Sequence, residues 1–296
     1  MKGAEDMTGA TNITKNDSLS PLLLCLACLG LLAWLFQPFA GKVVEFWTEN
    51  PTYTHSPLIP FVIAYLIWDK RKTLAETEIV PSYRGGLPML LISSLIWIVA
   101  VGGKSRFAVE LTFVFLIISV VWLNFGSALT KKLSFPLFLL LMMVPIPTIL
   151  YAAISRKLQL LSSTFGVAFI QLFSIPVHGE GNIIYLPETT LQVAEACSGI
   201  SSLVSLFTLA MIYAYISQKG FLRRSLIVLS SFPIAVFMNW VRIAATGMIA
   251  HYWSLEYAQG FYHSFSGWIV FIVAFGIFLM VGSAISYFSK AMMSRS

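Results

Sequence analysis

Apolar residues are gathered into long runs that are separated by short polar segments over most of the chain. Runs of roughly 20 residues are long enough to cross a bilayer as an α-helix. Eight such runs predict an all-α polytopic membrane protein with about eight transmembrane helices, at about 21–40, 56–69, 86–102, 107–125, 133–151, 197–216, 225–250 and 264–288. The second run is short and ends in the polar residues Asp69 to Lys72, so its helix is expected to begin nearer Tyr53.

The only long segment between two runs covers about 152–196. Its first part has apolar residues at helical spacing from Ile154 to Phe173, which predicts an amphipathic helix lying on the membrane surface. Its second part has two strand-like pieces, at 182–186 and 190–194, which predict a small β-hairpin. The hairpin leads directly into the sixth apolar run.

Composition agrees with a membrane protein, because 57% of the residues are apolar and only 11% are charged. A soluble domain carries roughly a quarter charged residues. Residues 1–20 are polar and are expected to form a disordered cytoplasmic tail. We expect residues 21–296 to form a single transmembrane domain, since no internal repeat or separate soluble part is visible.

The net charge of +6 is better explained by the orientation of the chain in the membrane than by a nucleic-acid partner. Cytoplasmic loops of membrane proteins carry an excess of Lys and Arg. Placing the N-terminus in the cytoplasm puts 13 of these residues inside and 5 outside. This asymmetry predicts that both termini are cytoplasmic. We therefore do not expect the positive charge to indicate binding of nucleic acid.

Three reactive side chains fall at the outer ends of the last three runs in this orientation. Cys197 begins the sixth run, Arg242 lies in the outer half of the seventh, and His263 immediately precedes the eighth. A helix N-terminus can lower the pKa of a thiol, and the thiolate is the nucleophile. The pattern therefore predicts a cysteine nucleophile assisted by a guanidinium and an imidazole.

Each of these residues also has a purely structural interpretation. Cysteine in an apolar segment is usually a packing residue, and this is the interpretation that we favour for Cys25 and Cys28. Arg242 could extend its charge to the outer interface, and His263 could be an interfacial histidine. No H-E-x-x-H, intramembrane Asp pair or G-x-S-x-G occurs, so we expect neither a metal nor an organic cofactor.

Four polar residues are candidates for supporting roles at the same face. Asn239 lies one turn before Arg242 and could orient its guanidinium or make a helix–helix hydrogen bond, the second being favoured. Glu195 and Ser198 flank the cysteine. His55 precedes the second run and either lines the site or caps a helix, the cap being favoured.

These motifs resemble the exosortase/archaeosortase family of membrane-embedded cysteine transpeptidases. Order and spacing agree over nearly all of the chain after residue 50. The segments that carry the resemblance are Tyr53-Thr54-His55-Ser56-Pro57-Leu58-Ile59-Pro60, Val144-Pro145-Ile146-Pro147, Val193-Ala194-Glu195-Ala196-Cys197-Ser198-Gly199-Ile200, Asn239-Trp240-Val241-Arg242-Ile243 and Phe261-Tyr262-His263-Ser264-Phe265-Ser266-Gly267-Trp268.

The resemblance implies a catalytic set of Cys197, Arg242 and His263 in the inner membrane of a bacterium, facing the periplasm. It implies exported proteins as substrates, each with a C-terminal sorting motif such as Pro-Glu-Pro, one transmembrane helix and a basic tail. Cleavage near the motif and transfer to an acceptor are the implied reaction, with a link to extracellular polysaccharide. Ser201-Ser202 differs from the Arg-containing form common in the family, which leaves the recognised motif open.

A function from another class remains open at the level of sequence. A transporter or polysaccharide-assembly component would also have about eight spans and a buried Arg242, which could bind a phosphate or carboxylate. The chain lacks the paired interrupted helices that many transporters have. A glycan or acyl transferase using His263 and a glutamate is a third possibility.

Overall fold

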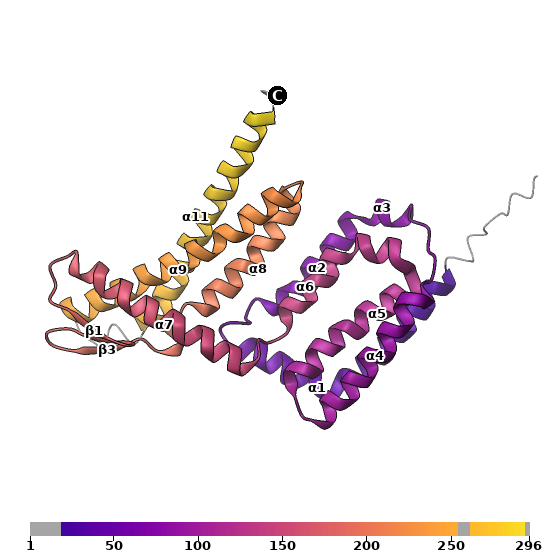
Figure 1. Cartoon of the computed structure of the whole chain (residues 1–296), viewed down its shortest axis with the longest axis horizontal. Coiled ribbons are helices and arrows are strands. Elements are labelled where there is room, and N and C mark those ends of the chain that lie inside the picture. Colours follow the sequence, from indigo (N-terminus) through magenta and orange to yellow (C-terminus); the bar gives the residue numbers. More distant parts are fainter. Residues whose placement is uncertain (1–18, 254–260, 294–296) are drawn as a thin grey trace, which may run out of the picture. The chain divides into compact units, whose positions relative to one another are not determined.

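The computed structural model describes residues 19–253 and 261–293, and side chains at 19, 20, 196, 261–264, 266 and 288–293 lie outside the described part. The predicted cytoplasmic tail falls almost entirely outside it. The described residues divide into two compact units, one made of residues up to Glu45 with 56–145, and the other made of 46–55 with the residues from Ile146 onward. Figure 1 shows the elements of both along the chain.

The first unit is helical. In chain order its elements are α1 (Leu19–Glu49, whose last residues belong to the second unit), η1 (Ser56–Leu58), α2 (Ile59–Asp69), α3 (Arg71–Ala75), α4 (Tyr83–Gly102), α5 (Arg106–Lys132), α6 (Ser134–Leu139) and η2 (Leu140–Met143). Helices α4 and α5 approach closely at Gly86, where an added Cβ would lie 2.5 Å from the Leu123 backbone. Cys25 packs with Leu116 and Val120 in the core, in agreement with its packing interpretation.

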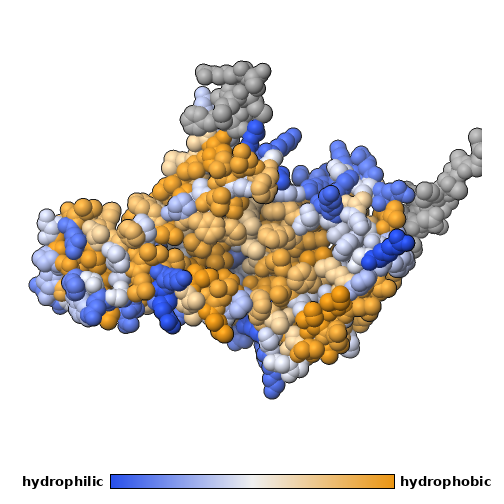
Figure 2. All heavy atoms as spheres, viewed as in Figure 1, coloured by the Kyte–Doolittle hydropathy of each residue, from blue (hydrophilic) through white to orange (hydrophobic). Residues whose placement is uncertain are grey.

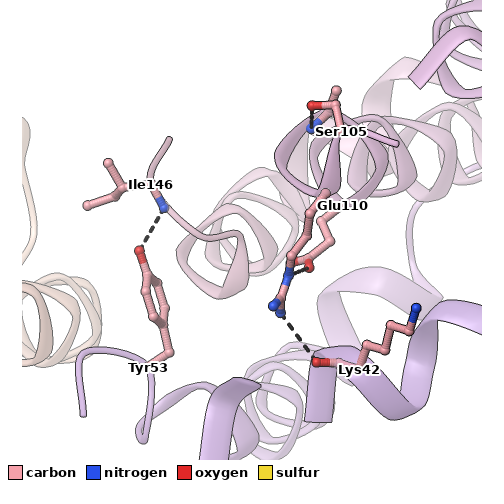
Figure 3. A network of polar contacts seen from close by, with 7 residues as sticks. Lys42, Tyr53, Ser105, Glu110 and Ile146 are labelled. Carbon is pink, nitrogen blue, oxygen red and sulfur yellow. Dashed lines mark hydrogen bonds and ion pairs between the residues drawn. The ribbon is translucent and has the colours of Figure 1, made fainter. Parts of the chain in front are cut away.

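An ion pair lies at the start of α5. Arg106 Nε donates to Glu110 Oε1 at 2.7 Å, and Arg106 Nη2 donates to the Lys42 carbonyl oxygen at 3.4 Å (Figure 3). Because Glu110 is buried, this pairing supplies the partner that a buried carboxylate needs. The contact also fixes the C-terminal part of α1 against α5.

The second unit combines helices with a small sheet. Its elements are α7 (Thr148–Gln171), β1 (His178–Glu180), β2 (Ile183–Tyr185), β3 (Thr190–Gln192), η3 (Glu195–Cys197), α8 (Ile200–Ser217), α9 (Phe221–Tyr252) and α11 (Phe261–Met293). Helices α8, α9 and α11 share a core that contains Leu206, Ala235 and Phe278. The predicted hairpin is confirmed in β2 and β3, but β1 pairs with β2 as a third antiparallel strand that was not predicted.

Within the described residues, six helices are long and apolar enough to cross a membrane: Pro21–Glu49, Tyr83–Gly102, Arg106–Lys132, Ile200–Ser217, Phe221–Tyr252 and Gly267–Tyr287. Their exposed faces carry large apolar side chains, and apolar residues dominate the surface in Figure 2. A soluble monomer rarely exposes so much contiguous apolar surface. The chain is therefore a multi-pass, mainly helical membrane protein.

Two of the eight predicted spans differ from these six. The run at 56–69 forms only the short η1 and α2, and the run at 133–151 is interrupted after η2. The interruption has a direct cause, because Pro145 and Pro147 lack the backbone N–H that a continuous helix requires. A seventh span results only if α6–η2 and α7 are counted together. The expected helix at 154–173 is present as α7.

Candidate functional site

The sheet of the second unit leads the chain to Cys197. Ile184, Leu191 and Val193 are buried in one apolar cluster with Ile243 of α9, and Cys197 packs against this cluster. The Val193 N–H donates to the Asn182 carbonyl oxygen at 2.8 Å, which closes the hairpin. The buried face of the hairpin thus fixes the position of the turn that follows it.

Cys197 lies in a short turn between the sheet and α8, and not in the first turn of a long helix. It ends η3, where its N–H donates to the Ala194 carbonyl oxygen at 2.9 Å. Ser198 is buried, and its Oγ accepts from the Ile200 N–H at 3.4 Å at the start of α8. The Glu195 side chain is exposed.

Gly199 permits this turn for two separate reasons. Its φ is +84°, in the left-handed region that residues with a Cβ avoid. A Cβ at this position would also lie 2.6 Å from the side-chain Cγ of Asn239. Glycine therefore allows both the reversal of the backbone and the close approach of α9.

Asn239 connects three elements around the cysteine. Its amide nitrogen donates to Ser162 Oγ of α7 at 2.9 Å and to the carbonyl oxygen of Cys197 at 3.0 Å. The Asn239 side chain is buried, and its bond to Ser162 is made away from water, whereas its bond to Cys197 is partly buried. Of the two sequence-based interpretations, the structure shows the helix–helix hydrogen bond, and it adds a direct bond to the backbone of Cys197.

Arg242 lies one turn further along α9 and is also buried. Its guanidinium carbon lies 3.7 Å from the position that a Cβ on Gly267 of α11 would occupy. This is an ordinary van der Waals distance, so the Arg242 guanidinium of α9 lies against α11 at Gly267. The charge of Arg242 is near enough to Cys197 to affect its ionisation.

Burial raises the pKa of the Cys197 thiol above its usual value. The charge of Arg242 and a hydrogen bond with the backbone of Ala194 act in the opposite direction without offsetting it. The expected lowering of this pKa by a helix N-terminus is therefore not what the structure shows, because desolvation of the thiolate is the larger effect.

The third predicted catalytic residue, His263, has a side chain outside the described part of the structure. Its position belongs to the first turn of α11, four residues before Gly267. Residues four apart share one face of a helix.

Hydroxyl groups fix residues 46–55 to the rest of the second unit. Thr52 Oγ1 lies 2.8 Å from Ser201 Oγ of α8 and 3.3 Å from the Tyr151 hydroxyl of α7. The Tyr53 hydroxyl accepts from the Ile146 N–H at 2.7 Å (Figure 3). Thr52 and Tyr53 are both buried, so these contacts are part of the interior of the unit.

His55 is buried against α8, at a distance from the cysteine along that helix. Its Nδ1 lies 3.3 Å from Ser205 Oγ and its Nε2 lies 3.4 Å from Thr208 Oγ1. These hydroxyls are ~8–12 Å of helix rise beyond Ile200. His55 thus neither joins Cys197 directly nor merely caps a helix. It belongs to a row of hydroxyl contacts along one face of α8.

Sequence reasoning did not identify Ser162, Ser201, Ser205 or Thr208 as part of this region. Three of them lie at i, i+4 and i+7 on α8, within an otherwise apolar span, and that spacing places them on one helical face. The row was therefore detectable in the sequence. Its partners Thr52 and His55 were not, because they lie about 150 residues earlier.

Burial lowers the pKa of His55, while a hydrogen bond with the Thr52 backbone opposes the shift. The unfolded chain then binds a proton more readily than the folded protein does as pH falls below about 6.5. We expect the melting temperature of the wild type to fall more steeply between pH 7.5 and pH 5 than that of His55→Gln, which cannot titrate. Parallel melting curves for the two proteins across this pH range would contradict the prediction.

Gly199→Ala should lower both stability and the reactivity of the site. Left-handed backbone costs an L-residue about 1–3 kcal/mol, and the new Cβ would also displace Asn239 from Cys197. Gly220→Ala is a matched control, because Gly220 has φ +92° but no atom within 4 Å of its added Cβ. We expect both variants to melt earlier, and only Gly199→Ala to alkylate Cys197 at an altered rate per folded molecule. If Gly199→Ala and Gly220→Ala alkylated at equal rates per folded molecule, the contact between Asn239 and Cys197 would not influence the reactivity of the thiol.

The described residues contain no group of three His, Cys, Asp or Glu side chains that could hold a metal ion. What they do contain at Cys197 is a partly buried thiol, a buried amide bonded to its carbonyl oxygen, and a buried positive charge. A thiol in this setting can attack an electrophilic carbon once a base removes its proton. The charge can then stabilise an anion that forms nearby.

Comparison with known proteins adds one finding. A family model described as Transmembrane exosortase (Exosortase_EpsH) matches residues 47–280. The match includes the segment 46–55 almost completely, the sheet, Cys197, Arg242 and His263. No curated protein and no solved structure shows significant similarity to the chain.

Proposed function

Because this chain belongs to the transmembrane exosortase family, we propose that it is an intramembrane cysteine transpeptidase or endopeptidase that uses Cys197 as its nucleophile. Its substrates are exported proteins that carry a C-terminal sorting tail, with a short motif, one transmembrane helix and a basic cluster. The observation that carries the proposal is the arrangement at Cys197, where Asn239 holds the backbone and Arg242 supplies a buried positive charge.

The proposed reaction begins with removal of the proton from the Cys197 thiol by His263. The thiolate attacks the peptide carbonyl carbon beside the sorting motif and forms a tetrahedral oxyanion. When this collapses, the C–N bond breaks, the amine leaves with the proton from His263, and a thioester to Cys197 remains. An acceptor amine or water then attacks the thioester and regenerates the thiol.

Arg242 stabilises negative charge in this scheme, either on the thiolate or on the oxyanion. A buried guanidinium suits this role because it stays charged and donates several hydrogen bonds. Asn239 acts through the backbone, by holding the carbonyl group of Cys197. Ser198 holds the first turn of α8, and Glu195 and His55 are assigned no direct part in bond making.

The substrate helix would enter sideways from the bilayer and bring its motif to Cys197. Tethering of this kind supplies much of the effective concentration that the reaction needs. The distribution of Lys and Arg supports cytoplasmic termini, and hence a site that faces the periplasm of a bacterial inner membrane. A link to extracellular polysaccharide belongs to the same proposal.

Mass analysis of exported proteins tests the function most directly. Cells with and without this gene are compared by intact mass and by terminal peptides. Loss of a C-terminal tail that depends on the gene, with or without an added acceptor mass, is the expected result. Exported proteins with unchanged C-termini in both strains would instead favour a transporter or an assembly component. A second test labels Cys197 with a thiol-directed probe in the presence of a substrate tail peptide. Labelling that the peptide does not block would favour the same alternative.

A further inference from the structure

An apolar cavity in the first unit has no part in the chemistry proposed above. It has a volume of about 370 Å³, lies against α4, α5 and α6, and is open on one side rather than enclosed. Its walls are formed mainly by Met89, Ile118, Trp122, Leu137 and Phe138. Pockets of roughly 300–1,000 Å³ with apolar walls and a few polar groups are typical of small-molecule sites.

One end of the cavity is polar and positively charged. Lys131 lines it, together with the hydroxyl-bearing residues Ser127, Thr130 and Ser134. Lys131 lies in the last turn of α5, so the polar end coincides with the end of a membrane-spanning helix. A lysine in this place can cover apolar surface with its stem and keep its ammonium group at the aqueous boundary.

The two neighbouring lysines at this helix end differ in their contacts. The Lys132 ammonium donates to Thr77 Oγ1 at 2.8 Å and lies 3.4 Å from the Thr73 carbonyl oxygen. Across the described ranges, the Lys131 ammonium makes no hydrogen bond or ion pair. Lys132 therefore holds α3 and the residues just after it, whereas Lys131 is available to a ligand.

From this arrangement we infer that the cavity binds an anionic phospholipid, with an acyl chain between α4, α5 and α6 and the phosphate at Lys131. Basic pockets between transmembrane helices on the cytoplasmic side are typical sites for anionic lipid headgroups. The surrounding segments, 69–84 and 131–132, carry six basic and three acidic residues, so their net charge also attracts an anion. The basic tail of a sorting substrate is a poor occupant, because Lys131 would repel it.

Native mass spectrometry of the full chain in detergent tests the inference with phosphatidylglycerol and phosphatidylcholine as probes. The wild type should bind phosphatidylglycerol more tightly than phosphatidylcholine. Lys131→Ala should weaken phosphatidylglycerol binding about five-fold, the worth of one surface lysine, and leave phosphatidylcholine binding unchanged. Lys132→Ala removes the same charge from the next residue and should change neither affinity by more than about two-fold.

A second variant tests the cavity independently of charge. Met89→Trp fills the apolar end and should weaken the binding of both lipids, while the melting temperature without lipid stays near that of the wild type. Equal affinity of the wild type for the two lipids would overturn the inference. Equal losses of phosphatidylglycerol affinity in Lys131→Ala and Lys132→Ala would also overturn it, because they would indicate a general attraction to the basic helix end. Unchanged lipid binding in Met89→Trp would overturn it as well.

Discussion

Cys197→Ser is expected to lower tail processing by at least about 10³-fold and to leave the uncleaved precursor in the membrane. The substitution replaces one small partly buried side chain by another, so the turn at Gly199 and the bond from Asn239 should persist. A hydroxyl group is a far weaker acid than a thiol, and the buried site already disfavours an anion. Precursor and product are measured by immunoblotting of a tagged substrate.

Cys28→Ala is the matched control for this experiment. Cys28 lies in α1 of the first unit, beside the buried Cys25, and should be dispensable for processing. The Cys197→Ser protein must also be inserted normally and melt near the wild-type temperature. Continued processing by a properly folded Cys197→Ser enzyme would reject the nucleophile, and with it the proposed reaction.

Arg242→Gln is expected to reduce the turnover of a substrate tail by about 10²–10³-fold, the usual cost of losing one donor to an oxyanion. Glutamine keeps a hydrogen-bonding group against Gly267 but removes the charge. Since that charge lowers the pKa of Cys197, its loss should raise the pKa further. Alkylation of Cys197, measured with Cys25 and Cys28 replaced by alanine, should then require a higher pH than in the wild type.

The two measurements separate the possible roles of the guanidinium. A shifted alkylation profile with a matching loss of turnover assigns Arg242 to the thiolate, and a larger loss of turnover assigns it to the oxyanion. Arg242→Lys keeps the charge but not the planar array of donors, so it should restore the alkylation profile better than the turnover. Normal turnover in folded Arg242→Gln would exclude both roles.

Elements with a long apolar pattern could be predicted from the sequence. The runs at 86–102, 197–216 and 225–250 correspond to α4, α8 and α9 with small differences at their ends. The run at 133–151 is interrupted because Pro145 and Pro147 each remove a backbone donor. The apolar composition of this run predicts one continuous span and does not indicate the break in the helix.

Strand β1 (His178–Glu180) was not predictable from the pattern of its side chains. His178, Gly179 and Glu180 are exposed and contain no β-branched residue, so their strand depends on backbone pairing with β2. Gly179 also permits close packing, since an added Cβ would lie 2.9 Å from Val167 of α7. Neither constraint can be read without the partner element.

The candidate site was predictable in its residue types but not in its electrostatics. The sequence motifs indicate Cys197, Asn239 and Arg242 as candidate site residues. Whether the pKa of Cys197 is raised or lowered depends on how completely the hairpin and α9 bury the thiol. The contact of Asn239 with Ser162 joins residues 77 positions apart, and no local pattern indicates such a pairing.

The anchoring of residues 46–55 to α8 has a consequence for biogenesis. Thr52 and His55 leave the ribosome 149 to 153 residues before Ser201 and Thr208, which they contact in the finished protein. Contacts of such separation form slowly and depend on prior closure of a long loop. Insertion of the early helices must therefore precede completion of the candidate site, and a chain arrested before α8 would occupy the membrane without the helices that complete that site.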